Sequence, residues 1–171
     1  ALLWVYLGIQ KGQVTQDGLT GLNNRRRLDQ YMWELDERSG ERETCCYLLM
    51  DVNKFKKVND TYGHVTGDEV LRLVAEQLKR TFGNMQAFLA RYGGDEFVVI
   101  VKGKTQDEMD VIIHQTQENV NAIAWGADTP WQLSISIGCA MRGEQGKQKS
   151  HELLALADER MYRQKKGIQD R

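Results

Sequence analysis

The sequence predicts an α/β (α+β) domain in which helices pack on a β-sheet. Continuous apolar runs indicate buried strands, and the longer segments between them repeat their apolar residues with the period of a helix. Two further apolar runs flank a pair of glycines and predict a central hairpin. Of the 171 residues, 41% are hydrophobic and 27% are charged, which is typical of one soluble domain with a substantial core.

The expected order is helix, strand, helix, helix, two hairpin strands, helix, strand, helix. Residues 1–16 are expected to be a linker or the tail of a helix. Asn23 or Asn24 fits an N-cap for the first helix. The apolar face of that helix repeats at helical spacing and consists of Leu28, Tyr31, Met32 and Leu35.

The first strand is the uninterrupted apolar run 45–50, which is expected to be buried on both faces. Its two cysteines point to opposite faces, and with Cys139 they are interpreted as small buried residues of a reducing compartment. Their spacing matches no zinc site. Asp51 ends the strand, where a carboxylate is costly unless it is paired or metal-bound. The alternative is an N-cap for the next turn.

Two capping boxes are expected, one formed by Thr66 with Glu69 and one by Thr105 with Glu108. Each opens a long helix, and the first of these helices should end near residues 81–83. Residues 131–138 alternate with period 2 and predict a strand exposed on one face. The last helix begins with the buried residues Leu153, Leu154, Ala157 and Met161.

The hairpin carries two carboxylates, Asp95 and Glu96, directly after Gly93 and Gly94. Glycine permits a tight turn and lets another molecule approach the backbone closely. A hairpin tip of this kind suits a cation and a phosphate. The alternative is an ordinary turn with Glu96 on a solvated strand.

The string at residues 91–97, Arg-Tyr-Gly-Gly-Asp-Glu-Phe, resembles the signature of the GGDEF family, the diguanylate cyclases. Residues 17–26 match the motif D-x-L-T-G-L-x-N-R-R, and residues 51–68 resemble D-x-D-x-F-K-x-x-N-D-x-x-G-H-x-x-G-D, with Asn53 where an Asp is common. The resemblance implies a palm-like fold related to nucleotide cyclases and a mostly antiparallel sheet. It places a GGDEF domain at 17–171, after a linker or upstream signalling helix at 1–16.

The resemblance also implies a reaction. Two GTP molecules are joined into cyclic di-GMP, two pyrophosphates are released, and a homodimer holds one GTP per subunit. Asp51 and Asp95 match the metal-binding carboxylates for Mg²⁺ or Mn²⁺, and Val52 matches the position that offers its backbone carbonyl. Asp95 and Glu96 match the pair that activates the ribose 3′-hydroxyl, and which of them is the base stays open.

Other matched positions concern the substrate. Asn59 and Asp68 match the residues that read guanine, whose donors and acceptor suit an amide and a carboxylate. Lys56 and Lys165 match the phosphate-facing lysines; without the resemblance both would be surface residues. His64 matches a position near the nucleotide, with a hydrogen-bonded structural histidine as an equal alternative.

Gly93 and Gly94 match the residues that leave space for phosphate. Two departures from the family pattern concern regulation and binding. Asn84 and Ala87 stand where many members carry the R-x-x-D inhibitory site, so feedback inhibition through that site is expected to be absent. Residues 166–171 place no arginine at the position of the family's phosphate-binding arginine.

The net charge and the length of the apolar stretches argue against two other classes of protein. Lys+Arg 23 against Asp+Glu 24 gives a net charge of -1, which argues against a nucleic-acid binder. No stretch reaches the roughly 18 apolar residues of a membrane span, so no direct membrane insertion is expected. A non-catalytic GTP-binding module, another nucleotide cyclase and a pure interaction domain stay as alternatives. The chain is expected to be the C-terminal, cytoplasmic domain of a longer bacterial sensor protein, and that longer protein is expected at the inner membrane.

Overall fold

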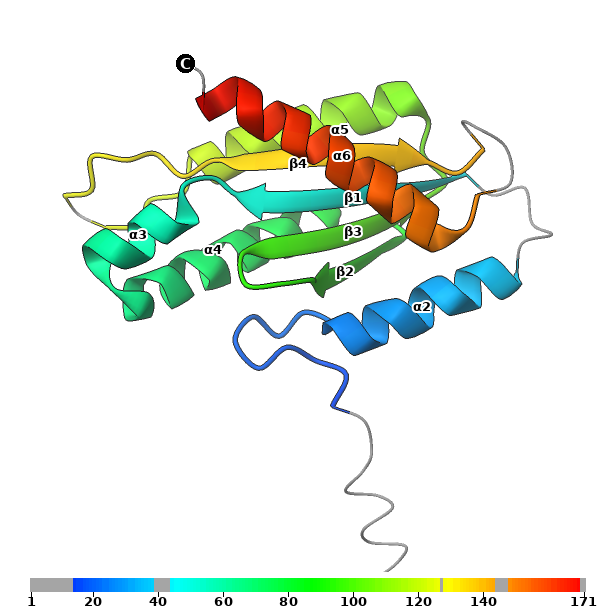
Figure 1. Cartoon of the computed structure of the whole chain (residues 1–171), viewed down its shortest axis with the longest axis horizontal. Helices are drawn as coiled ribbons and strands as arrows, with labels where there is room; N and C mark the ends of the chain where they lie inside the picture. Colours follow the sequence, from blue (N-terminus) through cyan, green and yellow to red (C-terminus); the bar gives the residue numbers. More distant parts are fainter. Residues whose placement is uncertain (1–13, 39–43, 127, 144–147, 170–171) are drawn as a thin grey trace, which may run out of the picture.

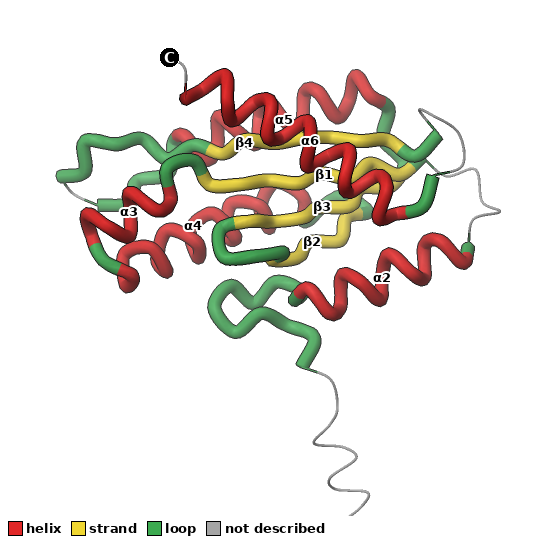
Figure 2. Tube along the Cα trace, in the orientation of Figure 1, coloured by secondary structure: helices red, strands yellow, loops and turns green. Residues whose placement is uncertain are grey.

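The computed structural model describes residues 14–38, 44–126, 128–143 and 148–169 and contains a single layer of strands with helices on both sides (Figures 1 and 2). The strands form an antiparallel sheet in the order β2-β3-β1-β4. The predicted order of elements is confirmed. The elements are α2 (Arg25–Glu37), β1 (Cys45–Val52), α3 (Phe55–Tyr62), α4 (His64–Phe82), β2 (Ala87–Arg91), β3 (Glu96–Lys102), α5 (Gln106–Asn121), β4 (Ile135–Met141) and α6 (Ser150–Gln169).

Two apolar cores lie on the two faces of the sheet. Cys46, Leu48 and Met50 of β1 face the core built with α4 and α5, whereas Tyr47 and Leu49 face the core built with α2 and α6. Every residue of β1 is therefore buried, because its alternating side chains enter opposite cores. This explains why the strand is an unbroken apolar run in the sequence.

One of the two predicted capping boxes is confirmed. The Thr105 side chain accepts from the backbone of Glu108, and the Glu108 side chain accepts from the backbone of Thr105. The box at Thr66 is wrong, because α4 begins two residues earlier, at His64. Gly63, with φ +86°, joins α3 directly to α4 and leaves no room for a separate capping residue.

The prediction of a half-exposed last strand at 131–138 is also wrong. The strand is β4, and all of its residues are buried except Cys139, which is half-buried. The alternation in the sequence comes from serines that make internal hydrogen bonds. Ser136 Oγ donates to Asn53 Oδ1 at 2.7 Å, and Asn53 Nδ2 donates to Ser134 Oγ at 3.0 Å. Asn53 thus ties the end of β1 to the start of β4.

The backbone of α6 passes directly over Gly138 of β4. A Cβ at this position would lie 1.8 Å from the carbonyl oxygen of Ala157 and 2.4 Å from the backbone nitrogen of Met161. Only glycine permits this approach. The contact fixes the height of α6 above the sheet, and α6 carries Lys165.

Both edges of the sheet are engaged by other segments. On the β2 side, Arg91 N donates to Asn23 O at 2.9 Å, and Asn23 N donates to Leu89 O at 3.2 Å. On the β4 side, Ile137 N donates to Gln164 Oε1 at 2.7 Å. Such coverage prevents further strands from pairing with these positions.

Candidate active site

Three carboxylates meet at one end of the sheet. Asp51 and Glu96 are direct partners across β1 and β3 in the register of the sheet. Asp95 precedes β3, and its carbonyl oxygen accepts from Val52 N at 3.2 Å. The antiparallel register therefore brings the end of one buried strand to the start of the other.

Lys165 of α6 reaches this group. Its Nζ lies 2.9 Å from Asp51 Oδ1, with side-chain exposures of 26% for the lysine and 11% for the aspartate. Asp51 Oδ1 is buried and accepts no hydrogen bond from the described residues. The contact is thus a charge pair without hydrogen-bond geometry, which leaves this oxygen able to accept a further ligand.

The hairpin turn above these carboxylates is held by Arg91. The guanidinium donates from Nη2 to Gly94 O at 2.8 Å and from Nε to Gly93 O at 3.2 Å. Its Nη1 pairs with Asp17 Oδ1 at 3.2 Å. The N-terminal motif that begins at Asp17 therefore anchors the turn, and this role was not predicted from the sequence.

The residues expected to read guanine lie on α3 and α4. The Asn59 side chain lies against Gly67, where a Cβ would be 1.8 Å from Asn59 Oδ1. That oxygen is buried and has no hydrogen-bond partner among the described residues. Asp68 follows Gly67 and is exposed. The two predicted residues therefore differ in exposure: the Asn59 acceptor is buried against Gly67, and the Asp68 side chain is exposed.

The two remaining positions predicted there are exposed. Lys56 is on the first turn of α3, and His64 opens α4. The His64 side chain makes no hydrogen bond with the part of the chain that the structure describes, so the alternative of a hydrogen-bonded structural histidine gains no support. In the part of the chain that the structure describes, neither residue contacts the carboxylates, and the short β1–α3 connection links the two groups of residues.

The family profile described as "Diguanylate cyclase, GGDEF domain" matches residues 14–171. The chain belongs to the GGDEF family. This is an enzyme family, and the GGDEF domain described here is similar to curated diguanylate cyclases. It is 38% identical over 156 residues to the probable diguanylate cyclase DgcI of Escherichia coli (strain K12), with 88% of this chain and 31% of that protein covered.

Diguanylate cyclase DosC of Escherichia coli (strain K12) is 34% identical over 161 residues, which cover 90% of this chain and 34% of that protein. The GGDEF domain thus spans about a third of the length of these two relatives. The solved coiled coil and GGDEF domain of DgcB from Caulobacter crescentus, in complex with c-di-GMP, has a TM-score of 0.84 and 29% identity. The superposed part covers 96% of this chain and 87% of the DgcB chain. The predicted fold and family are confirmed.

The carboxylates of the GGDEF hairpin are held in an environment that favours their protonated forms. Burial, followed by the charge of Asp51, raises the pKa of Asp95 to about 6. Burial also raises the pKa of Glu96, and the charges of Asp51 and Asp158 add to this shift, while Lys165 opposes it. A cation bound among these groups would relieve their mutual repulsion.

Replacing Asp95 by asparagine is expected to stabilise the domain at pH 7.5 in chelator-containing buffer. The raised pKa means that the folded wild type binds more protons than the unfolded chain between about pH 4 and 6, so its stability falls as the pH rises through that window. Since the carboxyl is only partly buried, we expect a gain of about 1 kcal/mol, or about 2–4 °C in melting temperature.

Thermal melts from pH 3.5 to 7.5 measure this difference. The two curves should converge near pH 4, where the wild-type carboxyl is protonated. Parallel pH dependences in the two proteins would contradict the assignment. Asp60→Asn, on exposed α3, controls for the loss of one surface charge.

No helix among the described residues has the length and apolar character needed to cross a bilayer. Residues 1–13, which include the apolar start of the sequence, lie outside the described part, so the expectation of a linker or helix there stays a prediction.

Proposed function

We propose that this domain condenses two GTP molecules into cyclic di-GMP and releases two pyrophosphates. The observation that carries the proposal is the convergence of Asp51, Asp95 and Glu96 beneath the double-glycine turn, in a chain of the GGDEF family. The residues 17–171 form the catalytic unit, preceded by a linker or helix, at the C-terminal end of a cytoplasmic bacterial signalling protein.

Two copies of the domain are required for this reaction. Each copy offers one carboxylate group and one guanine-reading pair, so one domain holds one GTP. The ribose 3′-hydroxyl of each nucleotide attacks the α-phosphorus of the other. We therefore infer that the active species is a homodimer whose hairpin ends face each other.

The carboxylates fit a divalent cation, Mg²⁺ or Mn²⁺. The buried Asp51 Oδ1 lacks a hydrogen bond, Asp95 lies beside it, and Val52 supplies a backbone carbonyl. Among the described residues no three His, Cys, Asp or Glu side chains gather to hold a metal alone. Magnesium commonly combines one or two carboxylates with substrate phosphates. When bound, it activates the attacking hydroxyl and stabilises the leaving oxygen.

The other residues position the substrate and move the proton. Asn59 and Asp68 accept hydrogen bonds from the guanine edge. Lys56 and Lys165 neutralise phosphate charge, which is most of what phosphoryl transfer needs from a protein. Asp95 or Glu96 accepts the 3′-hydroxyl proton. The raised pKa of Glu96 brings it closer to the neutral range in which a general base works well.

Three further assignments belong to the proposal. Gly93 and Gly94 leave room for phosphate against the backbone, and His64 lies near the nucleotide. Asn84, in the turn before β2, and Ala87, the first residue of β2, replace the charged pair of the inhibitory site. The domain should therefore escape product inhibition through that site.

Product analysis tests the proposed function. The protein is incubated at high concentration with GTP and Mg²⁺, and cyclic di-GMP is quantified by chromatography beside an Asp95→Ala variant. We expect product from the wild type and none from the variant. GTP binding without product in the wild type would favour a non-catalytic module, and the absence of both would leave an interaction domain.

A further inference from the structure

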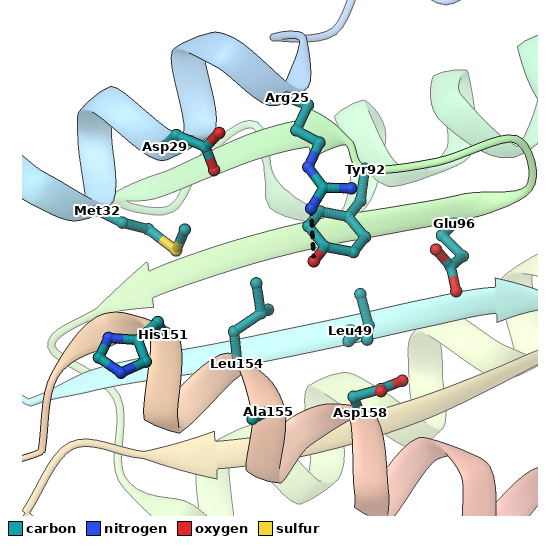
Figure 3. Close-up of a pocket in the computed structure, with 10 residues that line it drawn as sticks. All are labelled: Arg25, Asp29, Met32, Leu49, Tyr92, Glu96, His151, Leu154, Ala155 and Asp158. Atoms are coloured by element: carbon teal, nitrogen blue, oxygen red, sulfur yellow. Dashed lines mark hydrogen bonds between the residues drawn. The ribbon is translucent and has the colours of Figure 1, made fainter.

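The face of the sheet that carries α2 and α6 has polar groups on both sides of the carboxylate site. Toward β3, Figure 3 shows Glu96 in the wall of a pocket of about 370 Å³. Toward β4, Asp51 is the register partner of Ser136. Cross-strand partners point to the same face of a sheet, so the Ser136 hydroxyl lies beside the Asp51 carboxylate. Ser136 is fully buried, and its hydroxyl must therefore find an acceptor within the fold.

The acceptor is Asn53 and not Asp51. Ser136 Oγ donates to Asn53 Oδ1 at 2.7 Å, and Asn53 Nδ2 donates in turn to Ser134 Oγ at 3.0 Å. A hydroxyl has one proton to donate, so Asn53 keeps the Ser136 proton away from Asp51. This agrees with the buried Asp51 Oδ1, which accepts no hydrogen bond from the described residues. That oxygen stays available to a cation.

The backbone of Asn53 orients the peptide group that precedes it. Asn53 N donates to Ser134 O at 2.9 Å, on the β4 side of the strand. Val52 N donates to Asp95 O at 3.2 Å, on the opposite side. A trans peptide directs its carbonyl away from its own N–H, and the described residues contain no cis peptide bond. The Val52 carbonyl therefore points away from β4, toward Asp95.

The residue after Asn53 has a backbone conformation that needs support from its surroundings. Lys54 has φ +56°, and it is the one non-glycine residue with positive φ in the described ranges. Such a conformation is unfavourable for a residue with a Cβ and persists where the neighbouring structure holds it. Lys54 O accepts from Val58 N at 3.1 Å in the first turn of α3. The hydrogen bonds of Asn53 thus also fix where α3, which carries Lys56 and Asn59, begins.

We propose that Asn53 is a positioning residue of the cation site. This inference rests on the proposed function, because it takes Asp51, Val52 and Asp95 as the groups that hold the cation. Asn53 acts through its neighbours: it holds the Val52 carbonyl toward Asp95 and keeps the Ser136 hydroxyl from Asp51. Residues that orient metal ligands in this way are typically worth ten- to a hundredfold in metal affinity.

Titration of Mn²⁺ without nucleotide, followed by electron paramagnetic resonance, tests this role. For Asn53→Ala we expect the Mn²⁺ affinity to fall by about tenfold or more, because the Val52 carbonyl can turn and the Ser136 hydroxyl can donate to Asp51. Asn53→Asp keeps the shape of the side chain and can accept from both serine hydroxyls. It should bind Mn²⁺ no more weakly than the wild type.

Thr116→Ala is the matched control for the loss of a buried hydrogen bond. Thr116 is fully buried on α5, where its hydroxyl donates to Ile112 O at 2.6 Å, and α5 contributes no predicted site residue. Melting curves compare the stability of the variants. Thr116→Ala should lose stability and keep its Mn²⁺ affinity within about twofold, the size of a small change in a hydrogen-bond energy.

Two outcomes would overturn the proposal. Unchanged Mn²⁺ affinity in Asn53→Ala would mean that Asn53 only stabilises the fold. A loss in Asn53→Asp as large as that in Asn53→Ala would mean that the shape of the side chain does not set the affinity. If the alanine variant does not fold, Asn53→Ser replaces it; its hydroxyl is too short to bridge both serines, so Mn²⁺ binding should again weaken.

Cyclic di-GMP formation by the wild type is measured in parallel. A wild type that binds Mn²⁺ in an Asn53-dependent manner and makes no product would refute the proposed function and not the role of Asn53. A wild type that binds no Mn²⁺ would overturn the role of Asn53, whether or not product forms.

Discussion

Replacing Lys165 by methionine is expected to have opposite effects on catalysis and on metal binding. Cyclic di-GMP formation should fall by about a hundredfold or more, the usual loss when one group that stabilises transition-state charge is removed. Binding of Mn²⁺ without nucleotide should tighten by about tenfold, because the lysine cation no longer neutralises Asp51. In the wild type, Lys165 Nζ lies 2.9 Å from the buried Asp51 Oδ1, where a metal ion would compete with it.

Electron paramagnetic resonance of Mn²⁺ titrations measures the binding, and chromatography measures the product. Lys166→Met is the matched control, because the Lys166 ammonium lies 4.8 Å from the Tyr162 ring on the exposed side of α6. That variant should resemble the wild type in both measurements. Weaker Mn²⁺ binding in Lys165→Met would show that the lysine supports the metal site and does not compete for it.

Replacing Gly138 by alanine is expected to destabilise the fold by about 3 kcal/mol, at the upper end of the usual cost of overpacking. The added methyl group would meet backbone atoms of α6, with Ala157 O at 1.8 Å, and a helix backbone cannot rotate away as a side chain can. For a domain of this size the melting temperature should fall by about 6–12 °C.

Urea denaturation and thermal melts measure this effect. Gly167→Ala on the same helix is the control, because nothing lies within 4 Å of a Cβ there. Alanine should stabilise that position by about 0.5–1 kcal/mol relative to glycine. A Gly138→Ala variant within about 0.5 kcal/mol of the wild type, the range of ordinary surface substitutions, would mean that α6 moves away from the sheet at little cost.

Periodicity and capping chemistry were enough to predict the order of the elements. The apolar run of β1 and the box at Thr105 are local signals, and both are confirmed. One of the two errors came from a long-range interaction and the other from a tight junction between consecutive helices. The serines within 131–138 give the sequence the alternating pattern of an exposed strand. They do not form an exposed face, because Asn53, which lies 83 residues from Ser136 in the chain, is their hydrogen-bond partner. Gly63 starts α4 early because two helices meet there.

The candidate site was only partly accessible from the sequence. Asp51 and Glu96 are far apart in the chain, and their pairing follows from the register of β1 and β3, which composition does not specify. The motif resemblance grouped Asp51 with Asp95 as metal-binding carboxylates and Asp95 with Glu96 as the pair that activates the hydroxyl, but it did not give the register. Nor did it give the anchoring of the turn by Arg91 and Asp17, because that depends on how separate segments pack.

The covered sheet edges bear on how such a domain behaves when many copies are crowded together. Asn23 and Gln164 engage backbone groups that would otherwise be available for strand addition. Arg160 adds a hydrogen bond to Cys139 O at 2.7 Å. Copies of this domain that meet at high concentration are therefore expected to associate through side chains and not through added strands, which is the contact from which cross-β aggregates grow.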